Sequence, residues 1–170
     1  MCAVAWLAAA QVAAADPVTT RTFLAELNNF GAKSNGTVER FDCGSSAKDA
    51  DRTACVGNIK FGPFGISVMV HTSKNADAVA QAVAMMAAPE VMPDDMKPLM
   101  TATFLAMADH FMETFSPELS QANRTAALEK LMTHLDNDPD EVKIGERIYA
   151  AGAGMMLVFS VERADDQRTE

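Results

Sequence analysis

The chain has 170 residues, of which 49% are apolar and 22% are charged, a balance that excludes disordered, collagenous and multi-pass membrane proteins. Fourteen basic residues against 23 acidic ones give a net charge of −9, so a nucleic acid would meet net repulsion and is not expected as a partner. The length suits one domain with a single hydrophobic core, which we place at residues 16–163, before a charged tail at 164–170.

Residues 1–15 have the composition of an export signal rather than of a folded segment. They carry no charge and end in three alanines before Asp16, as an apolar signal region and its cleavage site do. The segment is shorter than the roughly 20 apolar residues that cross a bilayer. Because no basic residue precedes it, either the start lies within a longer leader or the segment is a buried Ala-rich helix. We predict export to a periplasmic or extracellular compartment and no stable membrane span.

The cysteines agree with export. Loss of the leader would remove Cys2 and leave Cys43 and Cys55, an even pair separated by a short polar loop. Such a pair is typical of a disulfide in an oxidising compartment, whereas two reduced thiols in a cytosolic protein are the alternative. A four-thiolate zinc site is excluded by the number of cysteines.

The first predicted elements are a helix and a β-hairpin. Asp16 and Pro17 suit an N-cap and the first helical position, and apolar residues then recur at helical spacing up to Gly31 or Gly36. Two-residue alternation predicts strands over 37–43 and 53–61. Antiparallel pairing that sets Cys43 opposite Cys55 also sets Phe41 opposite Gly57.

The rest of the chain predicts further strands, two helices and a terminal hairpin. Residues 64–72 alternate as a strand, and residues 78–86 are interpreted as a strand although alanine favours a helix. Helices are predicted over 93–115 and 120–135, and a hairpin over 142–161. The fold class is therefore α+β, with an antiparallel sheet of five or six strands covered on one face by three helices.

The helix over 93–115 carries an apolar stripe of methionine and phenylalanine. Its members are Met96, Met100, Phe104, Met107 and Phe111. We interpret the stripe as core packing, and a groove for a peptide or an apolar ligand is the alternative because methionine also lines adaptable apolar surfaces. A copper(I) site at Met92, Met96 and Met100 is a weaker alternative.

Polar candidates for chemistry are few. His110 and Glu113 lie three residues apart on one predicted helix, a spacing that suits a metal or an acid–base pair but also the polar edge of an apolar stripe. The acidic run over 136–140 imitates the start of a calcium loop without its glycine and final glutamate, and we interpret it as a solvated turn. No metal or other cofactor is predicted.

The leading functional hypothesis is an exported, disulfide-bonded binding or inhibitory module without chemistry of its own. Its partner would be a protein or an apolar small molecule, recognised by the loop between the two cysteines or by the Met/Phe surface. The alternatives are a carrier of an apolar ligand in that Met/Phe groove, and an envelope hydrolase or metalloenzyme that uses His110, Glu113 and His71.

Overall fold

The computed structural model describes residues 17–47, 49–74, 76–87, 93–133, 140–153 and 156–165, so the predicted leader lies outside the described residues. The elements are α1 (Thr20–Lys33), β1 (Thr37–Val38), β2 (Asp42–Ser45), β3 (Thr53–Phe61), β4 (Phe64–Thr72), β5 (Val79–Ala87), η1 (Asp94–Met96), α2 (Lys97–Phe115), α3 (Gln121–Thr133), β6 (Asp140–Ile144), β7 (Arg147–Ala153) and β8 (Met156–Arg163). None of the described helices is long and apolar enough to cross a membrane.

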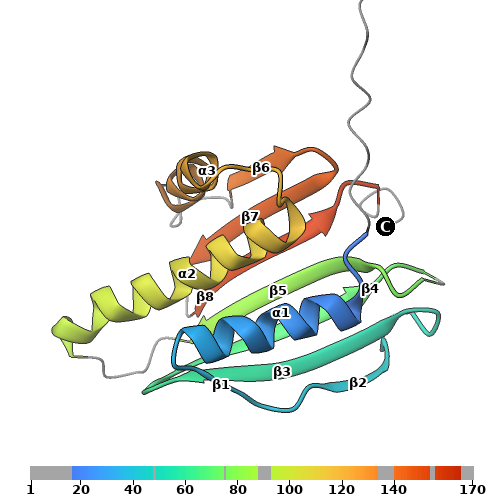
Figure 1. Ribbon diagram of the computed structural model, residues 1–170, viewed down its shortest axis with the longest axis horizontal. Coiled ribbons are helices and arrows are strands. Elements are labelled where there is room, and N and C mark those ends of the chain that lie inside the picture. Colours follow the sequence, from blue (N-terminus) through green and yellow to red (C-terminus); the bar gives the residue numbers. More distant parts are fainter. Residues whose placement is uncertain are drawn as a thin grey trace, which may run out of the picture.

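One antiparallel sheet forms the body of the fold, and the helices cover one of its faces (Figure 1). The strands follow the order β1-β3-β4-β5-β8-β7-β6, and β2 also pairs with β3. The α+β class and the order of helix, strands, two helices and terminal strands are confirmed. Residues 78–86 belong to a strand, as predicted, because their alanines form the small, buried face of β5 under α2.

The sheet has eight strands rather than five or six, because two predicted strands are each divided. The predicted strand over 37–43 is interrupted between Val38 and Asp42, giving β1 and β2. The predicted strand over 142–150 turns at Gly145, whose φ of 58° suits glycine, so Ile144 pairs with Arg147. This turn also places Tyr149 on the core face, where uninterrupted alternation predicts Ile148.

The register around the two cysteines is the predicted one. Cys43 pairs with Cys55 across β2 and β3. A Cβ atom added to Gly57 would lie 2.7 Å from the ring of Phe41, which shows that this ring covers the glycine. The aromatic ring therefore requires a glycine at the facing position of β3.

Helix α1 begins later than the sequence predicts. Thr19, rather than Asp16, is the N-cap, and its hydroxyl accepts a hydrogen bond from the Thr22 N–H at 3.2 Å. Just before the helix, the Val18 carbonyl accepts a hydrogen bond from the Val79 N–H at 2.8 Å. The chain is therefore extended against the start of β5 through Thr19, which explains why the helix cannot start at Pro17.

The core lies between the helices and the covered face of the sheet. Phe23 and Leu27 of α1 and Phe104 and Phe111 of α2 are completely buried there. One row of side chains on this face crosses six strands: Cys55, Val70, Ala82, Val161, Tyr149 and Val142. The disulfide thus joins β2 to one end of the core row, and Tyr149 lies near the other end.

Candidate functional site

The disulfide is the first predicted feature that the structure contains. The sulfur atoms of Cys43 and Cys55 are 2.11 Å apart, and Cys55 is buried while Cys43 lies on the exposed strand β2. Beyond the bond, the Ser46 N–H donates to the Arg52 carbonyl at 2.8 Å and closes the base of the loop. Asp49 and Arg52 form an ion pair at 3.4 Å within it.

The Met/Phe stripe of α2 lies in the hydrophobic core. Met100, Phe104, Met107 and Phe111 all belong to the buried cluster, and Met96 is partly buried against it. None of these side chains lines either of the two hollows described below. Met92, from the copper alternative, and the acidic turn over 136–139 lie outside the described residues.

A hollow does exist on the other side of α2, and we call it the apolar cleft. It has a volume of about 430 Å³ and lies between α2, the end of α1 and the turn between β3 and β4. Its lining is Phe30, Ser34, Asn35, Phe61, Gly62, Pro63, Phe64, Leu99, Ala102, Thr103 and Ala106. Leu99 is 52% exposed at this site.

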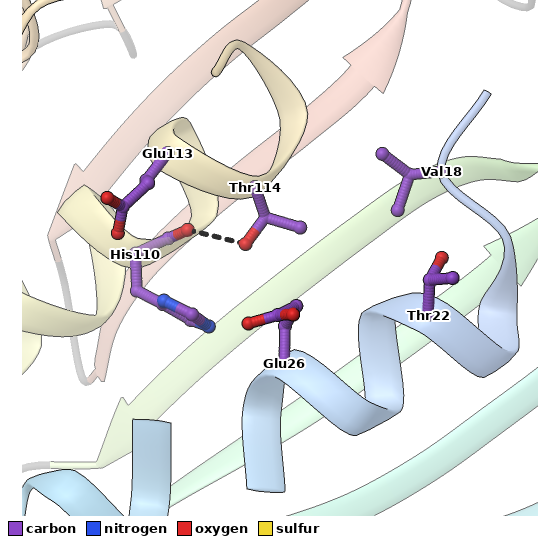
Figure 2. A pocket seen from close by; sticks show the side chains of 6 residues that line it. All are labelled: Val18, Thr22, Glu26, His110, Glu113 and Thr114. Carbon is purple, nitrogen blue, oxygen red and sulfur yellow. Dashed lines mark hydrogen bonds between the residues drawn. The ribbon is translucent and has the colours of Figure 1, made fainter. Parts of the chain in front are cut away.

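A second, more polar hollow lies further along the same two helices, and we call it the acidic pocket. Its volume is about 280 Å³, and it is lined by Val18, Thr22, Glu26, His110, Glu113 and Thr114 (Figure 2). The structure therefore brings His110 and Glu113 together, as their spacing predicts, and adds Glu26 from α1. The imidazole of His110 points across the pocket toward Glu26 in Figure 2.

His110 is held between the two helices. Its ring stacks on Phe30 with centroids 4.7 Å apart and an interplanar angle of 19°. Its Nε2 atom is buried and has no hydrogen-bond partner. Burial, the largest influence, lowers the pKa of His110 below its usual value, while the charges of Glu113 and Glu26 act to raise it.

The buried side chain of Arg124 interacts with two acidic residues of α2, Asp109 and Glu113. The Nε of Arg124, on α3, donates to Asp109 Oδ1 at 2.8 Å, and the guanidinium lies 3.9 Å from Glu113 Oε1. Asp109 is therefore the main partner of this arginine, and Glu113 forms only a longer ion pair with it. Glu113 remains exposed beside the acidic pocket.

The hydrolase or metalloenzyme alternative rests on His110 and Glu113, and the structure separates the further candidate His71 from them. His71 lies on β4 between Val70 and Thr72, whose side chains are buried on the covered face. Because strand side chains alternate, His71 belongs to the opposite face of the sheet from α2. Within the described ranges, no group of three His, Cys, Asp or Glu side chains could hold a metal ion.

Two features of this site are missed by our sequence analysis. Leu99, Ala102 and Ala106 recur at helical spacing on α2. This second apolar stripe could have indicated that α2 has an apolar face besides the one in the core. Glu26 gives no such signal, because its position beside His110 depends on the packing of α1 against α2. Comparisons of the chain with protein-family models, with curated proteins and with solved structures find no match.

Proposed function

We propose that this protein is an exported, disulfide-bonded binding module that holds a small apolar ligand in the apolar cleft. The observation that carries the proposal is the cleft itself. Its volume of about 430 Å³ lies within the range of small-molecule sites, which are mostly apolar with a few polar groups at the edge. Phe30, Phe61 and Leu99 supply the apolar wall, and Ser34 and Asn35 supply the polar edge.

Two features of the chain support export to an oxidising compartment. A disulfide persists in oxidising compartments and is uncommon in the cytosol. The uncharged apolar segment over 1–15 has the composition of a cleavable signal. Intact-mass measurement on protein recovered from outside the cytoplasm should therefore give a chain that begins near Asp16. Recovery from the cytosol with residues 1–15 retained would contradict export.

Protein recognition by the disulfide-held loop is the second candidate. Its support is the hydrogen bond between Ser46 and Arg52, which closes the loop base, and the Asp49–Arg52 ion pair inside the loop. A loop held in this way loses little conformational entropy when it binds. The cleft supports the small-ligand proposal better, because it is a concave site with exposed apolar side chains.

The ligand proposal is tested with a neutral fluorescent probe, N-phenyl-1-naphthylamine, added to the native protein. We expect saturable binding with enhanced fluorescence. Ala106→Trp places an indole in the cleft from an exposed position and should weaken binding about tenfold or more. Ala126→Trp, at an exposed alanine of α3, is the matched control and should leave binding unchanged. Equal binding by both variants, or no binding by the native protein, would overturn the proposal.

A further inference from the structure

The apolar cleft and the acidic pocket lie one after the other along the same two helices, α1 and α2, and together we call them the interhelical groove. Helix α1 lines the acidic pocket near its start, with Thr22 and Glu26, and the apolar cleft near its end, with Phe30 and Ser34. These four residues are spaced by four, so they share one face of the helix. Helix α2 runs in the opposite direction beside α1 (Figure 1) and lines the cleft with its first half and the pocket with its second half.

The stack of Phe30 and His110 marks the boundary between the two ends. Phe30 lines the cleft, and His110 lines the pocket. Along α2, Ala106 in the cleft and Glu113 in the pocket are seven residues apart, which corresponds to about 10 Å of helix. One small elongated molecule can therefore contact both ends.

The two ends differ in charge. The lining of the apolar cleft contains no charged residue. The acidic pocket contains the carboxylates of Glu26 and Glu113, and both residues are accessible to solvent. Arg124 lies 3.9 Å from Glu113 but bonds chiefly to Asp109 at 2.8 Å, so the pocket keeps an acidic character.

We propose that the ligand is an amphipathic cation, with its apolar body in the cleft and an ammonium group beside Glu26 and Glu113. This inference rests on the proposed function, because it names the chemical class of the ligand for the same groove. Charge complementarity favours an ammonium over a neutral or anionic head group. Thr114 lines the same pocket, and its hydroxyl, which donates to the His110 carbonyl at 2.9 Å, adds a hydrogen-bond acceptor.

The test is displacement of the bound neutral probe by three ten-carbon compounds, each kept below its micelle concentration. Decylamine, decanol and decanoate share one apolar chain and differ chiefly in the charge of the head group. We expect decylamine to displace the probe at a concentration roughly five- to tenfold lower than decanol, and decanoate to be the weakest, as partly exposed ion pairs allow.

A pair of double variants separates the pocket from the overall charge of the protein. Glu26→Gln with Glu113→Gln should bring decylamine to the level of decanol without weakening decanol. Glu118→Gln with Glu129→Gln changes the net charge by the same amount at two exposed positions outside the groove and should keep the preference.

The negative results distinguish a failure of the amphipathic-cation inference from a failure of the proposed function. If the three compounds displace the probe equally, or decanoate is the strongest, the amphipathic-cation inference is overturned while the apolar site remains. The inference is also overturned if both double variants lose the preference equally. If the native protein does not bind the probe at all, the proposed function itself fails.

Discussion

Helix α2 carries apolar side chains on two faces, and these faces have opposite environments. One face carries Met100, Phe104 and Phe111 and is buried against the sheet. The other carries Leu99 and Ala106 and lines the apolar cleft. Because α1 and the β3–β4 turn approach this second face without covering it, Leu99 remains 52% exposed.

The difference shows that apolar periodicity identifies the faces of a helix but does not say which of them is open. Large side chains on the buried face are needed to fill the core at crystal-like density. Small alanines on the other face leave the space that becomes the cleft. The size of the apolar side chains therefore distinguishes the core face from the face that lines the cleft.

The largest predicted effect compares truncation on these two faces. Phe104→Ala should lower the free energy of unfolding by roughly 3 to 5 kcal/mol, because it removes a completely buried ring and leaves a cavity. Leu99→Ala should lower it by less than about 1 kcal/mol, because half of that side chain is already in water. Denaturant unfolding of both variants gives the two values.

Probe binding should respond in the reverse order to this pair. Leu99→Ala removes part of the cleft wall and should weaken N-phenyl-1-naphthylamine, whereas Phe104→Ala should leave binding to the remaining folded protein intact. A large loss of stability in Leu99→Ala, or a small one in Phe104→Ala, would mean that the assignment of the two faces is wrong.

The second prediction separates stability from binding by a change at two residues that do not line the apolar cleft. Replacing Cys43 and Cys55 with alanine opens a crosslink between residues 12 apart in sequence and should lower the free energy of unfolding by roughly 3 kcal/mol. Probe binding should be unchanged, because neither cysteine lines the cleft.

Thiol labelling provides an independent check of the same bond. Unfolded, unreduced protein should react at Cys2 if the leader is retained, and at no cysteine if the leader is removed. Labelling of Cys43 or Cys55 would show that the crosslink is absent.

Much of the fold could be predicted because apolar and polar residues alternate clearly in strands that bury one face of the sheet. The strands over 53–61 and 64–72 alternate clearly, and the cysteine pairing fixes the register that places Phe41 over Gly57. The division of the predicted strand over 142–150 at Gly145 was missed because a two-residue turn leaves alternation nearly intact on both sides. Such a turn reverses the face of every following residue, including Tyr149.

The candidate site could be predicted only in part, because it depends on contacts between distant segments. His110 and Glu113 are neighbours on one helix, so their spacing is enough to bring them together. Glu26 and Phe30 join them from about 80 residues earlier in the chain, and only the packing of α1 beside α2 creates that contact. The exposed alanines of the cleft likewise resemble ordinary helix formers in the sequence.

The smallest predicted effect concerns His110, which lies on α2 between the apolar cleft and the acidic pocket. Burial lowers its pKa below that of an exposed imidazole, about 6.5. Between the lowered pKa and this value, the unfolded chain binds a proton that the folded chain does not. Stability contributed by this residue is therefore complete above the unfolded pKa and falls as the pH decreases below it.

The measurement compares the free energy of unfolding at pH 7.5 and at pH 5.5 in the native protein and two variants. His110→Phe keeps a ring that can stack on Phe30, and His110→Gln removes the ring while keeping a polar group. Both variants lack the titrating imidazole, so both should lose less stability than the native protein over this interval. If all three proteins show the same decrease, protonation of His110 does not oppose folding and the prediction is wrong.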